Sequence, residues 1–159
     1  MFTLTGDLRF YYEPTAAELS GAVIKADGVD LARDPGFETA VLISLGTDAR
    51  ADESDTLPGT SETRRGHWSE VVSGFNIGSK LWLLERSKLD KTTLRLAEQY
   101  VNECLAWMVE DRIVEAVDTV ASRGSISQIN FITEFKRPKG GVTFKWFANW
   151  EYQIIGGLE

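Results

Sequence analysis

The residues best suited to chemistry are concentrated between Arg64 and Leu84. This stretch opens with Arg64-Arg65-Gly66-His67-Trp68 and later continues as Gly78-Ser79-Lys80, ahead of an apolar segment that contains Trp82. An imidazole can act as a general base, guanidinium groups bind carboxylates through paired hydrogen bonds, and tryptophan anchors protein interfaces. The stretch could therefore hold either a catalytic site or a docking site.

A catalytic site would need partners that the sequence does not supply. His67 is the only histidine, and the chain contains no G-x-S-x-G motif, no Gly-rich phosphate loop followed by Lys and Ser or Thr, and no H-E-x-x-H motif. Glycoside hydrolysis needs only two suitably spaced carboxylates. Because 24 acidic residues guarantee candidate pairs, their presence is not diagnostic. We therefore predict no enzyme and assign no catalytic residue.

The loop of residues 48–63 and the single cysteine allow two interpretations each. The loop carries five acidic residues and could bind calcium or could be solvated, but the ligand spacing of a calcium loop is absent. Cys104 could be a reactive thiol or a small buried apolar residue, and we favour the second because no basic residue flanks it at a fixed spacing. We predict no metal and no cofactor.

Composition limits the class of protein. A chain of 159 residues suits one domain, expected to span 1–159, and a net charge of −7 argues against nucleic acid as the main partner. One cysteine cannot form an internal disulfide, which fits a reducing compartment. The sequence shows no secretory signal and no apolar run near the roughly 18 residues of a membrane span.

The elements before the central stretch are an arm and a helix. Residues 1–30 contain alternating apolar residues that predict an N-terminal β arm or hairpin. Asp34 and Pro35 predict the start of a helix that ends at about Gly46. Its apolar residues cover most of its circumference, so we expect it to be buried in a core or at a subunit contact.

A long helix follows the central stretch. Residues 79–84 are expected to deliver leucines to the core, and Asp90 to cap a helix from Lys91 to about Asp111. Arg95, Glu98, Asn102 and Glu103 are expected to face away from the core. The apolar face is defined by residues at spacings of three and four: Ala97, Tyr100, Val101, Cys104, Leu105 and Met108.

The rest of the chain predicts three strands, at 113–121, 126–136 and 142–154, joined by tight turns. The fold class is therefore α+β, with two main helices packed on an antiparallel β meander. The last strand is expected at the sheet edge, with Phe147 on its outer side. Either a partner pairs with this edge, or the chain's own loop shields it.

The region from Leu31 to Val120 resembles the small baseplate wedge family of Mu-like phages and related prophages. More distantly, the layout is similar to the sheath-initiating, lysozyme-like wedge subunit of other contractile tails. The resemblance rests on ordered segments: GFETAVLISL at 36–45 with Thr47-Asp48, RRGHW at 64–68, GSKLWLL at 78–84 and LAWMVED at 105–111.

This resemblance implies a structural subunit of a contractile-tail baseplate, located in the virion and assembled in the bacterial host cytoplasm. Its partners would be larger wedge proteins, the sheath, and tube or hub proteins, in a six-fold assembly without nucleic acid or membrane. The alternative implied by the distant relatives is a peptidoglycan-cleaving tail domain.

The residue types are compatible with an assembly role. Arg64 and Arg65 could bind carboxylates of a neighbour or of their own chain, and Trp82 is expected to be core rather than interface. We interpret residues 64–68 as a docking loop, and 78–84 as the segment that fixes this loop to the long helix. The candidate partner-binding residues are Arg64, Arg65, His67, Trp68, Lys80 and Phe147.

Overall fold

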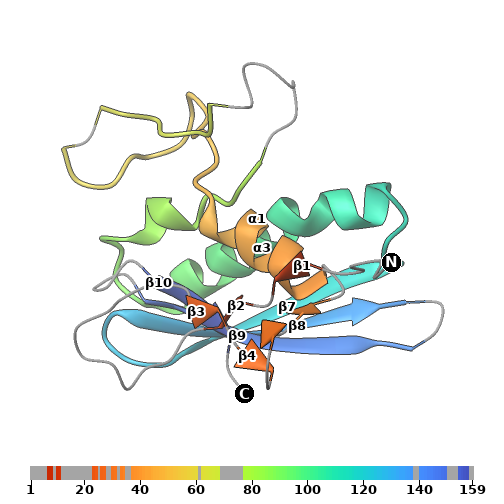
Figure 1. Ribbon diagram of the computed structural model, residues 1–159. Coiled ribbons are helices and arrows are strands. Elements are labelled where there is room, and N and C mark those ends of the chain that lie inside the picture. The colour runs from red at the N-terminus through yellow and green to blue at the C-terminus, as the bar shows by residue number, and fades with distance from the viewer. Residues whose placement is uncertain are drawn as a thin grey trace.

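A computed structural model describes residues 37–60, 62–68, 77–137, 140–149 and 154–157, together with two-residue strand segments between residues 7 and 34. Two α-helices lie side by side on one face of an antiparallel sheet, and the loop that follows the first helix projects on the side away from the sheet (Figure 1). The predicted α+β class, with helices packed on a β meander, is confirmed.

The sheet contains strands β7 (Ala116–Arg123), β8 (Gln128–Lys136), β9 (Val142–Asn149) and β10 (Ile154–Gly157), in the order β10-β9-β8-β7. All neighbouring strands are antiparallel, with Thr119 opposite Thr133 and Phe131 opposite Trp146. The predicted turn after Arg123 is present, since the Gly124 N–H donates to the Gln128 carbonyl at 2.9 Å. The first two predicted strands are therefore found within three residues of their expected bounds.

The fourth strand corrects the expectation for the end of the chain. The predicted strand 142–154 is divided into β9 and β10, and β10 pairs with β9, so that Ile154 lies opposite Asn149. The prediction that the strand containing Phe147 forms the sheet edge is wrong, because β9 lies between β8 and β10. Phe147 is buried, with 8% of its surface exposed, although alternation places it on the outer side of the sheet. Residues 150–153 of the predicted strand lie outside the described ranges.

The long helix α3 (Lys91–Glu110) agrees with the sequence. The Asp90 carboxylate accepts hydrogen bonds from the N–H groups of Thr92 and Thr93, both at 2.9 Å, so it satisfies two donors that a helix start leaves unpaired. The 3-10 helix η1 (Leu81–Leu84) precedes it. All four η1 side chains are buried, including Trp82, as predicted for a core tryptophan.

The first helix, α1 (Phe37–Gly46), begins two residues later than predicted. Asp34 is not its N-cap residue, because it pairs with Asp7 in the antiparallel strands β1 (Asp7–Leu8) and β6 (Arg33–Asp34). Val41 is buried in the core, whereas Ile43 is 57% exposed. Contacts within the chain therefore bury one side of α1 in the core. The side of α1 that carries Ile43 is the side that a subunit contact would cover.

One core joins both helices, η1 and the sheet. The Phe131 and Trp146 rings stack with centroids 4.0 Å apart. The Trp146 indole N–H donates to the Thr133 hydroxyl at 3.0 Å, and that hydroxyl lies 3.1 Å from the Thr119 hydroxyl, so the polar atoms on this face are paired. Among the described residues, the fully buried apolar side chains are Val41, Leu45, Ala97, Val101, Leu105, Met108, Ile129, Phe131, Phe135 and Trp146.

The outer edge of β7 is covered by α3. Glu98 accepts a hydrogen bond from the Ala121 N–H at 2.8 Å, so its carboxylate occupies part of the strand edge. The expectation that Glu98 and Asn102 face away from the core is therefore wrong, since the Asn102 Oδ1 atom is also buried. The helical spacing placed both residues on the polar side of α3, but strand β7 also packs against that side.

The N-terminal region contains further two-residue strands, which support the predicted β arm. β2 (Phe10–Tyr11) pairs with β3 (Val23–Ile24), and β4 (Ala26–Asp27) pairs with β5 (Asp30–Leu31), in both cases antiparallel. Residues 1–6 and 12–22 of the predicted arm lie outside the described residues.

Candidate functional site

The base of the projecting loop is fixed to the end of α1. The Ser79 N–H donates to the Thr47 carbonyl at 2.8 Å, the Ala49 N–H donates to the Ser79 carbonyl at 3.0 Å, and the Ser79 hydroxyl donates to the Leu45 carbonyl at 2.8 Å. Gly78 has φ +106°, and a Cβ atom there would lie 2.4 Å from the Thr47 carbonyl oxygen. Only glycine allows this close approach. Residues 78–84 thus fix the loop to α1 by hydrogen bonds and to α3 by packing.

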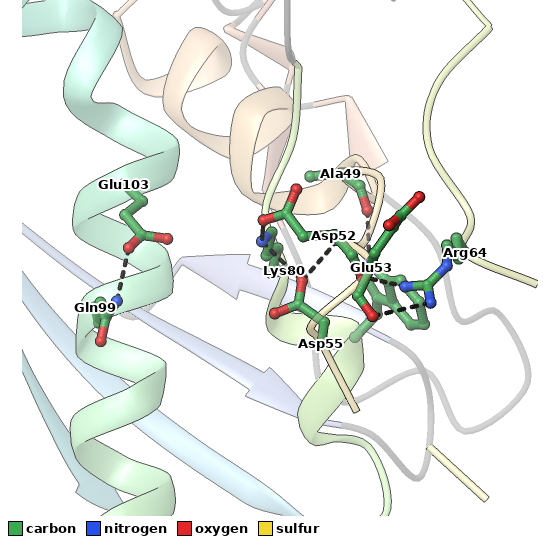
Figure 2. Close-up of polar contacts among 9 residues, drawn as sticks. Ala49, Asp52, Glu53, Asp55, Arg64, Lys80, Gln99 and Glu103 are labelled. Atoms are coloured by element: carbon green, nitrogen blue, oxygen red, sulfur yellow. Dashed lines mark hydrogen bonds and ion pairs between the residues drawn. The ribbon is translucent and has the colours of Figure 1, made fainter. Parts of the chain in front are cut away.

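The acidic part of the loop is organised around Lys80. Its ammonium group lies 2.5 Å from the Asp52 carboxylate and 2.8 Å from that of Asp55, and Figure 2 shows it between them. The Asp52 N–H also donates to the Asp55 carboxylate at 2.8 Å. The carboxylates of Asp52 and Asp55 are therefore held by a cation of the same chain. In the part of the chain that the structure describes, no three acidic, histidine or cysteine side chains are grouped to hold a metal ion.

These contacts shift both charged partners. Partial burial raises the pKa of Asp55, but the hydrogen bonds from Lys80 and the Asp52 N–H outweigh it and hold that pKa below its ordinary value. Partial burial lowers the pKa of Lys80, and the hydrogen bonds to Asp52 and Asp55 more than reverse this, so the net shift is upward. Both shifts favour the ionised pair.

Arg65 forms a second ion-pair cluster. Its guanidinium donates to Glu85 at 3.1 and 3.2 Å and to Asp48 at 2.9 Å, and lies 4.6 Å from the centre of the Trp82 ring. Partial burial lowers its pKa, but the hydrogen bonds to Glu85 and Asp48 raise it above the ordinary value. Trp82 is itself held by a 2.8 Å hydrogen bond from its indole N–H to the Ala49 carbonyl.

Arg64 is held within the chain in a different way. Its guanidinium donates to the Asp52 carbonyl, and to the Glu53 carbonyl at 3.2 Å (Figure 2). The Arg64 carbonyl accepts the Ala51 N–H at 2.9 Å. Arg65 therefore shows the internal pairing with carboxylates that the sequence allowed, whereas Arg64 is held internally by backbone carbonyls. Lys80 is likewise engaged internally.

The end of the docking loop, residues 64–68, differs from its base. Arg65 and Gly66 both have positive φ angles, +43° and +104°, so the chain turns sharply after the ion-pair cluster. This turn presents Trp68, which is 74% exposed, beside His67, with ring centroids 5.4 Å apart. Among the six predicted partner-binding residues, Trp68 is thus the one with the largest free surface. Phe147, by contrast, is buried.

Cys104 has the surroundings of an inert side chain. Its thiol donates to the Ser44 carbonyl at 3.2 Å, and burial raises its pKa to about 12. A thiol with such a pKa is protonated at neutral pH and is a poor nucleophile. This supports the interpretation of Cys104 as a small buried residue between α1 and α3.

The acidic partners of Arg65 and Lys80 were not predicted from the sequence. Asp48, Asp52, Asp55 and Glu85 were visible as charges, but they lie 17 to 28 residues from the cations that they bind. Such separations carry no periodic signal. The sequence does contain a signal for a further surface: Glu103, Trp107 and Glu110 are spaced by four and three residues, so they share a face of α3.

No described helix is both long and apolar enough to cross a membrane. Residues 37–142 match the family model described as phage protein GP46. The baseplate protein gp46 of Escherichia phage Mu is 43% identical over 100 residues, which cover 63% of this chain and 69% of the Mu protein. The Mu-like prophage FluMu protein gp46 of Haemophilus influenzae is 33% identical over 119 residues, covering 74% of this chain and 81% of that protein. The chain therefore belongs to the GP46 family of Mu-like phage baseplate proteins.

Proposed function

We propose that this chain is a structural protein of a contractile phage-tail baseplate and that it docks on other baseplate proteins through Trp68. Membership of the GP46 family and the similarity to a baseplate protein of phage Mu support the baseplate role. The observation that carries the docking role is the exposure of Trp68 at the end of a loop whose base is held by two ion-pair clusters.

The size of the tryptophan contact suits this role. A tryptophan side chain buries about 150–250 Å² in an interface, and apolar burial contributes about 25 cal/mol per Å². Covering the exposed 74% of Trp68 would therefore contribute about 3–5 kcal/mol before the costs of association. Because Arg65 and Lys80 already order the base of the loop, little further entropy is lost when the partner binds.

Within the baseplate, we propose the position of a small wedge subunit. It would join larger wedge proteins, contact the first ring of the sheath, and lie next to the tube or hub in a six-fold assembly. The ordered motifs at 36–48, 64–68, 78–84 and 105–111 support this assignment by their resemblance to the wedge family. The mature location would be the virion tail, after assembly in the host cytoplasm.

No contact in the described part of the chain favours the alternative, a peptidoglycan-cleaving domain. A glycosidase of this kind needs a carboxylic acid whose pKa is raised, so that it can protonate the leaving group. In the loop, Asp52 and Asp55 are bound to Lys80 and Asp48 to Arg65, and the pKa of Asp55 is lowered. We therefore propose a non-enzymatic role, which a cell-wall lysis assay on the purified protein would overturn if lysis depended on one of its carboxylates.

The docking role can be tested by co-expression with the neighbouring tail genes. We expect Trp68→Ala to reduce copurification of baseplate partners strongly while the melting temperature of the isolated chain changes little. Ile126→Ala is the matched control, because Ile126 is also exposed, at 86%, but lies in the β7–β8 turn. Equal copurification of wild type and Trp68→Ala would overturn the docking role.

A further inference from the structure

A cleft of about 820 Å³ lies between α3 and the loop of residues 49–53. Tyr100 and Trp107 contribute aromatic surface from α3, and Ala51 contributes apolar surface from the loop. Glu103 also lines this space, and its carboxylate accepts a hydrogen bond from the Gln99 side chain at 2.7 Å (Figure 2). We call this space the α3 cleft. It can receive more than one side chain of a partner.

The charges that line the α3 cleft are unequally compensated. Lys80 is bound by two aspartates, and Arg64 by two backbone carbonyls. Glu53, Glu103 and Glu110 are exposed lining residues, and no cation of the described chain lies within ion-pair distance of them. Arg50 is an exposed lining cation, and Arg64 keeps its positive charge in the lining because its hydrogen-bond partners are neutral carbonyls. The lining thus carries four acids (Asp52, Glu53, Glu103 and Glu110) against three cations (Arg50, Arg64 and Lys80), an excess of one negative charge, and Glu103 and Glu110 place two of the acids together on α3.

The arrangement on α3 is specific as well as acidic. Glu103, Trp107 and Glu110 lie on one helical face, which places the tryptophan between the two carboxylates. Trp107 is half-buried and packs against the core with part of its surface. A guanidinium group stacks on an indole ring and forms paired hydrogen bonds with carboxylates, so an arginine side chain satisfies both features at once.

We propose that the α3 cleft receives an arginine side chain from a short segment of a baseplate partner, a second contact that rests on the proposed function but is separate from Trp68. Charge complementarity supports this occupant. The apolar surfaces of Tyr100 and Ala51 would contact the residues on either side of the arginine.

Binding of two small peptides tests the proposal. The probes are an acetylated, amidated tripeptide with arginine between two leucines, and the same peptide with citrulline, its neutral isostere. Titrated into the ¹⁵N-labelled full chain, the arginine peptide is expected to shift the Trp107 indole signal and the amide signals of 49–53 and 103–110. The citrulline peptide is expected to bind about tenfold more weakly, since it lacks the charge.

A matched pair of double variants separates local from overall charge. Glu103→Gln with Glu110→Gln should weaken the arginine peptide about tenfold, whereas Glu115→Gln with Glu134→Gln removes the same charge from exposed positions outside the cleft and should leave binding unchanged. The proposal is overturned by equal binding of the two peptides, by equal effects of the two double variants, or by no shift in the cleft.

Copurification with the tail proteins distinguishes this proposal from the proposed function. We expect the Glu103 and Glu110 double variant to lose partners that the control double variant retains. If Trp68→Ala abolishes copurification but the cleft variant does not, the proposed function stands and the cleft proposal fails. If the wild-type chain copurifies with no baseplate protein, the proposed function itself fails, and the peptide titration still decides whether the cleft binds arginine.

Discussion

Replacing Arg65 by alanine should destabilise the isolated chain by about 2 kcal/mol. The guanidinium makes hydrogen bonds with Glu85 and Asp48 while 33% of its side chain stays exposed, so we count these bonds at about 1–1.5 kcal/mol together. Its position over the Trp82 ring adds about 0.5–1 kcal/mol. For a chain of this length, the loss corresponds to a fall in melting temperature of about 4–8 °C.

Two further variants divide this loss into charge, geometry and backbone parts. Arg65→Lys keeps the charge but cannot form the paired hydrogen bonds to Glu85, and we expect about half the loss. Arg65→Gly removes the same contacts as alanine but suits the positive φ of +43°, so it should be about 0.5–1 kcal/mol less destabilising than Arg65→Ala. Arg50→Ala is the control, because Arg50 is exposed on the same loop, and it should change stability by less than about 0.5 kcal/mol.

The assay is urea unfolding of each purified variant, followed by tryptophan fluorescence and by circular dichroism. Agreement of the two probes is needed before the free energies of unfolding are compared. If Arg65→Ala unfolds within about 0.5 kcal/mol of the wild type, the internal ion pairs do not hold the docking loop. The guanidinium would then be available to a neighbouring subunit, which is the other interpretation that the sequence allowed.

Three further predictions concern the base of the loop and the helix beneath it. Gly78→Ala should lower the free energy of unfolding by about 3 kcal/mol or more, because the new Cβ would lie 2.4 Å from the Thr47 carbonyl oxygen. Gly140→Ala is the control: Gly140 also has a positive φ, but no heavy atom lies within 4 Å of the new Cβ, so this variant should lose less stability. Folding lowers the pKa of Asp55, so its ion pair stabilises the chain fully above the unfolded pKa of about 3.9. This stabilisation is lost as the pH falls through the lower pKa of the folded state. The free energy of unfolding in urea, measured across this pH range, should therefore depend less on pH for Asp55→Asn than for the wild type. Cys104 should resist a thiol reagent in the native chain at mildly alkaline pH and react after unfolding, since burial raises its pKa to about 12; rapid native labelling would contradict this.

The local parts of the fold were predictable because their signals are short in range. Asp90 and the three- and four-residue spacing from Ala97 to Met108 gave α3 to within one residue of its end. The hairpin between β7 and β8 followed from alternation and the turn at Gly124. In each case the pattern and the resulting contact lie within about one element of each other.

The features that were missed depend on contacts between distant residues. The sequence Trp150 to Gln153 contains no Gly, Pro, Asn or Asp to mark the end of β9, so β10 was not anticipated. Alternation placed Phe147 on the outer side correctly, but its burial is a tertiary property that alternation cannot report.

The candidate site was located by residue type but not by pairing. The concentration of Arg, Gly and Trp identified residues 64–68 and 78–84, and the structure brings the bases of these two segments together. Which cations bind which acids could not be predicted, because 24 acidic residues offer many alternatives. The exposure of Trp68 and the burial of Trp82 became distinct only once the loop and η1 were placed.

The most direct test of the docking proposal is an electron cryo-microscopy structure of the assembled tail tip that contains this chain. We predict that Trp68 is buried against a second baseplate protein, while Arg65 keeps its contacts with Glu85 and Asp48 inside the chain. A tail tip that lacks the chain, or one in which Trp68 remains exposed to solvent, would contradict the account.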